Sequence, residues 1–305
     1  MLNRHSLRVK TMQQLYAYFQ DGAANNKKFQ IELNNSINDV YNAYVYVLYT
    51  LKDIVNYSIK DSEIKKKKFI PTQEDLNIST KISATPIIKS LFTSSSFVSY
   101  CKEHIKTIKS WEKDEEIVRA EYYKLIKTPE YKNYIVSKNT SIDDDREIIL
   151  IITKALLKDS PLFDSYISKF YINWQYDKSV VSELVFKTLK SKIPELRNLV
   201  RYPENINFAI NLFKLVTNSY THFDEIIKSK TINWDFNRIL LLDKILIRMA
   251  IAEFINFDSI PHVSTIDEYL TISKQFSSSK SYIFINGILD AILKDIDKLK
   301  VKLAN

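Results

Sequence analysis

Residues 242–254 read LDKILIRMAIAEF, and this stretch decides the fold of the chain. It lies inside a strongly apolar segment, residues 236–257, that ends before Ile260 and Pro261. Apolar residues recur at helical spacing along one stripe of the segment: Ile239, Leu242, Leu246 and Met249. The segment therefore predicts a long apolar helix. Two of its charged residues, Arg248 and Glu253, are expected to be structural ion pairs or rim charges.

Helical patterns flank this stretch on both sides. Residues 207–228 form one continuous helical pattern before it. After it, Thr265 is followed three residues later by Glu268, which is the pattern of a capping box. In that motif a hydroxyl and a carboxylate each bond the backbone N–H of the other residue. The pair predicts a helix that opens at Thr265 and runs to about Phe276.

The last helical pattern begins at the serines of residues 277–279, which are expected to cap it, and runs through Lys300. Its inward face is made of Ile285, Ile288, Ile292, Ile296 and Leu299. Gly287 lies inside this pattern, where glycine costs roughly 1 kcal/mol relative to alanine. We expect the glycine to serve a close approach between two helices.

The N-terminal segment has a more polar helical pattern. A stripe recurs at helical spacing at Leu7, Thr11, Leu15 and Tyr18. It predicts an amphipathic helix that ends near Gln20, with Gly22 just beyond its C-cap. Residues 1–20 hold three basic residues and no acid, in a chain whose net charge is +8. The first helix is thus the densest net positive segment, which points to a polyanionic partner.

The composition excludes several classes of protein. Among 305 residues there are only two glycines, whereas dinucleotide-binding loops, P-loops and the Gly-rich cofactor loops of methyltransferases need several close together. With seven prolines as well, the chain has few helix breakers, so we expect a mostly helical fold. A single cysteine, Cys101, forms neither an internal disulfide nor a Cys-rich zinc site. We expect no cofactor, no metal, no secretory signal and no membrane span, hence a cytoplasmic protein.

The middle region, residues 23–204, is the least regular part of the chain. Four tyrosines between positions 41 and 49 fit a core or an interface better than a cofactor site. Residues 65–68 are four lysines that could touch RNA, although a solvated loop is the more common meaning of such a run. Residues 143–145 are three aspartates that suit the start of a helix. The apolar content predicts a helical insertion or subdomain, and its role stays open.

Several separated motifs together resemble the NusB family. RHSLR at residues 4–8 and MQQLY at residues 12–16 are similar to the basic first helix of that family. LDKILIRMAIAEF is similar to its long hydrophobic helix, and FINGILD at residues 284–290 to its closing Phe-(Val/Ile)-Asn-Gly-(Val/Ile)-Leu-Asp motif. Shorter matches continue in the same order at residues 260–261, 266–268 and 274–276. The chain looks like a long NusB variant with a large insert.

This resemblance implies an all-α fold, a NusB-like helical bundle core with a large helical insertion after the first helix. Residues 1–22 and 205–305 would form the core, and residues 23–204 the insertion. It also implies a transcription antitermination factor rather than an enzyme. Members of the family pair with ribosomal protein NusE. The pair binds boxA, a single-stranded element in the leader of ribosomal RNA transcripts, joins elongating RNA polymerase and suppresses premature termination.

The resemblance also assigns binding roles to particular residues. The candidate RNA-binding residues are Arg4, His5, Arg8, Gln13, Lys244, Lys280 and Phe284. Arginine binds phosphate with two hydrogen bonds, lysine neutralises it, a glutamine amide reads a base edge, and phenylalanine stacks on a base. Tyr16 and Asp243 match positions on the surface that faces NusE. His5 and Ser6 stand where short homologues commonly have arginine, so the basic motif is thinner here.

Two other functions stay open. The thinner basic motif also fits a helical protein-interaction scaffold that has lost RNA binding and whose insertion carries a different partner. Salt-sensitive RNA binding would distinguish this scaffold from the antitermination factor. NusB-like domains also occur fused to RNA methyltransferases. Here no Gly-rich cofactor loop follows the core, so an enzyme is the less favoured alternative. The insertion could enlarge the NusE interface, contact polymerase, form a homodimer or pack back on the core. No membrane partner is expected.

Overall fold

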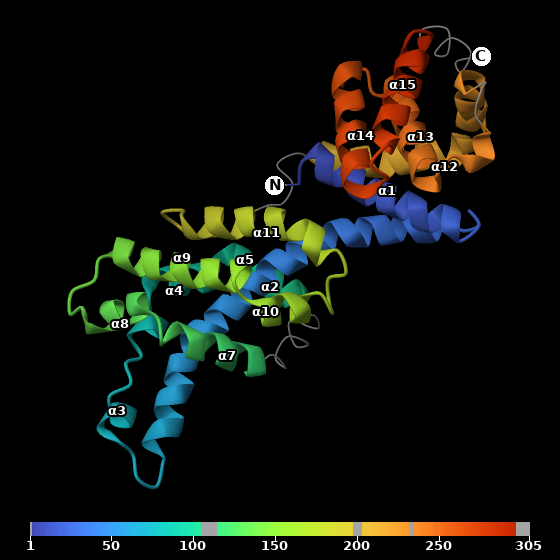
Figure 1. The fold of residues 1–305 in the computed structure, drawn as a ribbon. Helices are drawn as coiled ribbons and strands as arrows, with labels where there is room; N and C mark the ends of the chain where they lie inside the picture. The colour runs from blue at the N-terminus through green and yellow to red at the C-terminus, as the bar shows by residue number, and fades with distance from the viewer. Residues whose placement is uncertain (1, 105–114, 198–202, 232–234, 297–305) are drawn as a thin grey trace. The chain divides into compact units, whose positions relative to one another are not determined.

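The computed structural model describes residues 2–104, 115–197, 203–231 and 235–296, and the regular secondary structure within these ranges is all helical (Figure 1). This agrees with the expected mostly helical fold and with the scarcity of glycine. Within the described ranges, no helix has the length and apolar character that a membrane span needs. The chain divides into two compact units: unit 1, Asp39–Leu199, and unit 2, Leu2–Asn38 with Val200–Asn305.

The boundary between the units differs from the sequence-based division at residues 22/23 and 204/205. It falls inside α2 (Asn26–Lys66), because the first turns of this helix pack with α1 (Arg4–Gln20) and α12 (Pro203–Lys230). Asn26 Nδ2 donates a hydrogen bond to Thr217 Oγ1 at 2.9 Å. The rings of Tyr18 and Phe29 meet edge to face, with centroids 5.7 Å apart.

Unit 2 is built around α13 (Leu241–Asn256), the helix that contains the LDKILIRMAIAEF stretch. It packs against α1, α12, α14 (His262–Phe276) and α15 (Ser281–Leu293). Every residue from Ile245 to Phe254 is buried, because a helix that is apolar on all sides can be covered on all sides. The predicted apolar helix is confirmed, except that Phe236–Arg238 form a separate 3-10 helix, η2, before it.

The structure confirms the amphipathic helix predicted at the N-terminus. Leu7, Thr11 and Leu15 are fully buried along one face of α1. Asn3 caps the helix, since its side-chain oxygen accepts a hydrogen bond from the backbone N–H of Ser6 at 2.8 Å. Beyond the other end, Gly22 has φ +74°, the left-handed conformation that glycine adopts without strain.

The structure corrects three details of the last helices. Helix α14 opens at His262, a turn before Thr265, so Thr265 is not a cap, and its buried hydroxyl donates to Glu253 instead. No atom outside its own helix backbone lies within 4 Å of the position a Cβ would take on Gly287, so this glycine does not serve a close approach between helices. The N-cap of α15 is Lys280, without a side-chain cap from the preceding serines, and Leu299 lies outside the described residues.

Unit 1 contains the rest of α2 and a set of shorter helices. They are α3 (Gln73–Leu76), η1 (Lys81–Ala84), α4 (Pro86–Thr93), α5 (Ser95–Glu103), α7 (Glu115–Leu125), α8 (Pro129–Val136), α9 (Ile142–Lys158), α10 (Pro161–Ile167) and α11 (Trp174–Leu189). Tyr44 and Tyr46 are buried, so the tyrosine-rich part of α2 contributes to the core. The predicted aspartates lie in the first turn of α9, where Ser141 and Asp144 form a capping box.

Candidate functional site

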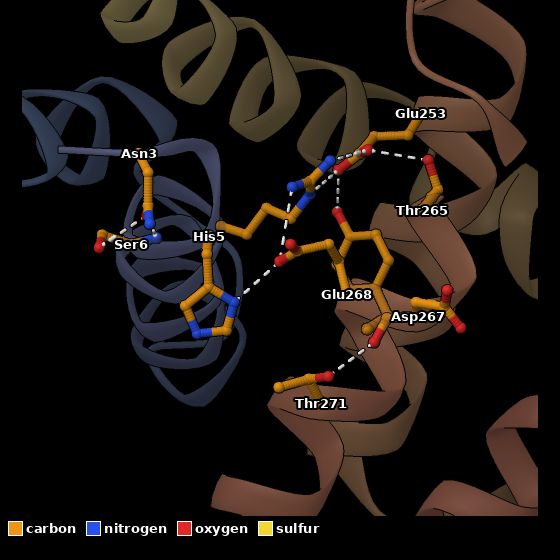
Figure 2. A network of polar contacts seen from close by, with 10 residues as sticks. Asn3, His5, Ser6, Glu253, Thr265, Asp267, Glu268 and Thr271 are labelled. Atoms are coloured by element: carbon orange, nitrogen blue, oxygen red, sulfur yellow. Dashed lines mark hydrogen bonds and ion pairs between the residues drawn. The ribbon is translucent and has the colours of Figure 1, made fainter. Parts of the chain in front are cut away.

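In unit 2, a buried arginine of α1 meets the carboxylates of α13 and α14. Arg8 Nε and Nη2 donate to the two carboxylate oxygens of Glu253 at 2.7 and 2.8 Å, and Arg8 Nη1 lies 3.7 Å from Glu268 Oε2. Only 3% of the Arg8 side chain is exposed, and none of Glu253. Thr265 Oγ1 and the Tyr269 hydroxyl also donate to Glu253, which completes the network around this carboxylate (Figure 2).

The electrostatics of this network fix the charge on Arg8. Burial lowers the pKa of Arg8, but the hydrogen bond to Glu253 and the nearby negative charges outweigh it, so the pKa is raised overall. Burial, and then the charge of Glu253, also raise the pKa of Tyr269. The Arg8 cation is thus permanently charged and neutralised inside unit 2. Arg8 therefore ties α1 to α13 and α14, and the phosphate contact expected for it stays a prediction.

Arg4 and His5 lie on the more exposed side of α1. His5 Nδ1 forms a hydrogen bond with Glu268 Oε2 at 2.8 Å, and each of these side chains is about one-third exposed, at 31% and 34% (Figure 2). The Arg4 guanidinium carbon lies 5.7 Å from the centre of the Phe208 ring. Arg4 is exposed, whereas Arg8 and Lys10 are buried. Within α1, therefore, Arg4 is the cation that solvent or a ligand can reach.

A pocket of about 490 Å³ opens beside the first turns of α13 and α15. Its lining residues are Asp235, Arg238, Ile239, Leu240, Asp243, Ser278, Lys280, Ser281 and Phe284. It brings together three residues that the resemblance singles out: Asp243, Lys280 and Phe284. Arg238 and Lys280 are exposed and Phe284 is half-buried. Two cations beside an aromatic ring suit an unpaired nucleotide, which offers a phosphate and a π-face.

The two residues expected to face NusE lie in different surroundings. Asp243 is buried, and its carboxylate accepts hydrogen bonds from Ser277 Oγ at 2.6 Å and Ser281 Oγ at 2.8 Å. Tyr16 is 42% exposed on α1, and its hydroxyl accepts a hydrogen bond from Gln20 Nε2 at 3.2 Å. Asp243 therefore holds the start of α15 and shapes the pocket, while Tyr16 presents its ring to solvent.

Lys244 and Gln13 lie outside the pocket lining. Lys244 Nζ sits 4.4 Å from the centre of the Phe236 ring, which Lys228 Nζ approaches to 5.0 Å. Burial, and then the charge of Arg248, lower the pKa of Lys244. Gln13 is half-buried in α1. Neither residue is among those that line the pocket with Phe284.

The candidate RNA-binding residues thus fall mainly into two groups at opposite ends of α13. Arg8 and His5 are tied to Glu253 and Glu268, near the end of α13, whereas Lys280 and Phe284 share a pocket with Asp243, in its first turn. At a rise of 1.5 Å per residue, Asp243 and Glu253 are about 15 Å apart along the helix axis. A ligand that touches both groups must span that distance.

Sequence reasoning missed Arg238 and the partners of the buried charges. Arg238 lies in the short helix η2, where no periodic pattern marks it as functional. The ion pairs expected for Arg248 and Glu253 are present, but their partners are distant in sequence: Asp224 bonds Arg248 twice at 2.8 Å, and Arg8 bonds Glu253. The sequence could indicate only that Arg248 and Glu253, as charges inside an apolar helix, require buried partners, and not which residues those partners are.

The structure offers little for metal chemistry. In the described ranges, no three side chains of His, Cys, Asp or Glu are grouped so that they could hold a metal ion. Cys101 and His104, which have a metal-like spacing, lie at the end of α5, where the His104 ring stacks on Tyr100 with centroids 4.2 Å apart. Burial raises the pKa of the Cys101 thiol, which disfavours the thiolate that a metal would need.

Comparisons with known proteins concern the C-terminal part of the chain. Residues 179–294 match the model of the NusB family. "Transcription antitermination protein NusB" of Salinibacter ruber is 37% identical over 94 residues, which cover 31% of this chain and 59% of that protein. The protein of the same name from Chloroherpeton thalassium is 35% identical over 121 residues, or 40% and 56% of the two chains. The chain therefore spans a little over half the length of these relatives. No solved structure matches it.

Proposed function

We propose that this protein, in which residues 179–294 form a NusB family domain, is a transcription antitermination factor that binds RNA. NusB is a non-enzymatic antitermination factor, which agrees with the expectation that this chain is not an enzyme. In the finer form of the proposal, it pairs in the cytoplasm with ribosomal protein NusE. The pair binds single-stranded boxA in ribosomal RNA leaders and acts on elongating RNA polymerase.

The observation that carries this proposal is the docking of α1 on the NusB family domain. Helix α1 lies outside the matched range, yet Arg8 bonds Glu253 of α13 and His5 bonds Glu268 of α14. Because these contacts are charged and partly or fully buried, they fix where α1 lies on the domain. The basic N-terminal helix and the helices of the family domain therefore belong to the same unit, and an RNA that uses both would have to span the two groups of candidate contacts.

The RNA contacts would divide between phosphate and base. Arg4, Arg238 and Lys280 are exposed cations that can bind phosphate oxygens, and each contact releases counterions. Phe284 in the pocket can stack on a base. In this scheme Arg8 positions α1 and does not touch RNA itself. His5, Gln13 and Lys244 remain candidates at the edge of the same surface.

The NusE contact would use the exposed face of α1. Tyr16 is 42% exposed there, and tyrosine is a frequent anchor of protein interfaces because a rigid ring buries much area. Asp243 would act on this interface only through the pocket that it shapes, since both of its oxygens already bond serine hydroxyls. Assembly, rather than a chemical step, is the proposed mechanism.

The test is fluorescence anisotropy of labelled boxA RNA, titrated with the full chain, with and without NusE from the same organism. A scrambled RNA measures sequence selectivity. The Tyr16→Ala variant should reduce the enhancement by NusE without changing binding by the chain alone. Val263→Ala, which trims an exposed residue of α14, serves as its matched control.

The outcomes separate this proposal from the alternative of a scaffold without RNA binding. Selective, NusE-enhanced binding that weakens with salt supports the proposal. Capture of NusE without any selective RNA binding supports the scaffold, for which the burial of Arg8 and Lys10 is the favouring observation. Absence of both interactions contradicts the proposal and favours the scaffold whose insertion carries a different partner.

A further inference from the structure

The turn that follows α2 in unit 1 exposes both lysines and large apolar side chains. Residues 64–70 read IKKKKFI, and α2 ends at Lys66 within them. Phe69 is 100% exposed and Ile70 is 79% exposed. Single exposed apolar residues are common, but two adjacent ones with almost no cover, beside a run of cations, form a surface with the character of a binding site. Residues 64–70 are called the tip below.

The four lysines of the tip divide into two pairs with different surroundings. Lys65 Nζ bonds Asp61 Oδ2 at 2.9 Å, and Lys68 Nζ bonds Asp75 Oδ1 at 2.8 Å. Within the described chain, Lys66 and Lys67 are exposed and have no acidic partner. Lys65 therefore pairs within α2 and Lys68 ties the turn to α3, whereas Lys66 and Lys67 are left to meet a ligand.

The carboxylate that anchors the turn is itself firmly held. Asp75 Oδ2 accepts a hydrogen bond from the backbone N–H of Thr72 at 3.0 Å, and the two residues form a capping box at the start of α3. The hydrogen bond from Lys68, followed by that from Thr72, lowers the pKa of Asp75 to about 2. The anchor is thus charged at neutral pH. Phe69 is therefore exposed on a turn that is held by hydrogen bonds. This turn follows the C-terminal end of α2 in unit 1 (Figure 1).

We propose that the tip binds single-stranded RNA, with Lys66 and Lys67 on phosphates and Phe69 stacked on a base. Exposed aromatic rings flanked by cations are the general means of holding a single strand without sequence selectivity. A ring that is fully exposed in the free protein gains more from stacking than one that is already covered. The proposed function concerns unit 2, so the tip would be an additional contact outside the NusB family domain.

A single strand fits the tip better than an anionic membrane surface does. Two exposed acids flank the lysines, Glu63 on α2 and Glu74 on α3. A flat anionic surface would have to approach both of them, whereas a single strand can follow a narrow line over Lys66, Lys67 and Phe69. The tip also lacks the long amphipathic helix that interfacial anchoring normally uses.

The test compares matched variants of the full chain for binding to a labelled uridine-rich RNA of about 15 nucleotides, a length within the usual single-strand site size. The tip variant is Lys66→Ala/Lys67→Ala/Phe69→Ala. The control variant is Lys132→Ala/Lys138→Ala/Val136→Ala, which removes two exposed lysines and an exposed apolar residue elsewhere in unit 1. A third variant, Arg238→Ala/Lys280→Ala/Phe284→Ala, removes the proposed contacts of unit 2. All changed side chains are exposed or line a pocket, and circular dichroism checks the helix content.

We expect the tip variant to bind at least about fivefold more weakly than the control variant, because stacking of a single base is worth at least that factor. The slope of log affinity against log salt should fall by about 1.4, or about 0.7 for each lost phosphate contact. The same loss should appear when the tip changes are made in the unit 2 variant. Vesicles that contain phosphatidylserine are tested with the same proteins.

Each outcome bears on one proposal or on both. If the tip variant binds RNA like the control while the unit 2 variant is weakened, the tip inference is overturned and the proposed function stands. If only the tip variant is weakened, the tip inference stands and the RNA contacts of unit 2 fail. Binding to vesicles but not to RNA, or no binding to either by the unaltered protein, overturns the tip inference and counts against RNA binding by unit 2.

Discussion

At the C-terminal end of α13, Glu253 holds Arg8 in an ion pair that is almost fully buried. At the N-terminal end, Asp243 holds two serine hydroxyls and leaves Arg238 and Lys280 exposed beside a pocket. Both carboxylates are buried on the same helix, yet one is paired with a cation and the other with neutral donors. The two ends therefore differ in the cations that a ligand can reach. At the C-terminal end Arg8 is neutralised inside the unit, whereas at the N-terminal end Arg238 and Lys280 face solvent.

We therefore expect the C-terminal end of α13 to contribute mainly to stability and the N-terminal end mainly to binding. Removing one partner of a buried ion pair leaves an uncompensated charge in the interior, which is costly. Removing an exposed cation costs little stability and instead lowers affinity for phosphate. Changes at the two ends of the helix should therefore give opposite profiles of unfolding free energy and RNA affinity.

The largest effect is expected from Glu253→Gln. The substitution keeps the shape of the side chain but leaves the buried Arg8 cation with only the partly exposed Glu268, 3.7 Å away, as a counter-charge, so the free energy of unfolding should fall by about 3–5 kcal/mol. Urea denaturation of the full chain, followed by circular dichroism, measures it. Arg4→Ala, which removes an exposed cation of α1, is the control. A loss below about 1 kcal/mol would show that water or a rearrangement solvates the Arg8 cation. It would contradict the expectation that this end of α13 contributes mainly to stability.

The next effect is expected from Asp243→Asn. An amide accepts the hydroxyls of Ser277 and Ser281 more weakly than a carboxylate does, so we expect a loss of about 1.5–3 kcal/mol in unfolding free energy. This variant should also weaken RNA binding, because the serine segment forms one wall of the pocket. Asp267→Asn, at an exposed position of α14, provides the comparison. Unchanged stability would mean that the serines do not depend on the charge of Asp243.

A smaller effect, on affinity rather than stability, is expected from Phe284→Ala. Loss of one stacked base costs about 1–3 kcal/mol of binding free energy, which anisotropy with boxA RNA would detect as weaker binding at constant salt. Ile283→Ala trims the neighbouring exposed side chain, which does not line the pocket. Equal affinities for the two variants would remove Phe284 from the RNA surface.

The smallest effect is expected from Lys244→Met. Because burial lowers the pKa of Lys244, its charge is disfavoured in the folded state, so an apolar stem of similar length should change stability by no more than about 0.5 kcal/mol. The unfolded chain binds the proton more tightly, so this lysine adds stability as the pH rises toward its ordinary pKa. The difference in stability between the two proteins should therefore shrink or reverse in alkaline buffer. A large loss of unfolding free energy in Lys244→Met at neutral pH would contradict the interpretation that the Lys244 charge is disfavoured by burial.

The sequence predicted those helices whose formation depends on residues a few positions apart. The apolar stretch of α13, the stripe on α1 and the acidic start of α9 each follow from residues a few positions apart. The capping box expected at Thr265 failed because Pro261 provides an earlier start. Proline lacks an N–H to donate and suits the edge of a helix, which leaves Thr265 one turn inside, where its hydroxyl finds Glu253.

The candidate site was less predictable, because burial and long-range pairing decide what a charged residue does. The sequence places Arg8 on the basic face of the first helix, but its partner Glu253 is 245 positions away. The family motif singles out Phe284, and Lys280 lies four residues before it. The pocket that joins them also contains Arg238, which no motif marks. Arg4 is exposed and Arg8 is buried, although the two lie only four positions apart in the sequence. The sequence pattern alone does not show this difference in exposure.

Phosphate binding at the N-terminal end of α13 is tested most directly by the salt dependence of boxA RNA binding by the Arg238→Ala/Lys280→Ala variant. Lys27→Ala/Lys214→Ala, which removes two exposed lysines elsewhere in unit 2, is measured beside it. If the two cations at the pocket bind phosphate, their removal should lower the slope of log affinity against log salt by about 1.4 relative to this control. Equal slopes and equal affinities for the two variants would contradict the claim that the N-terminal end of α13 is the binding end.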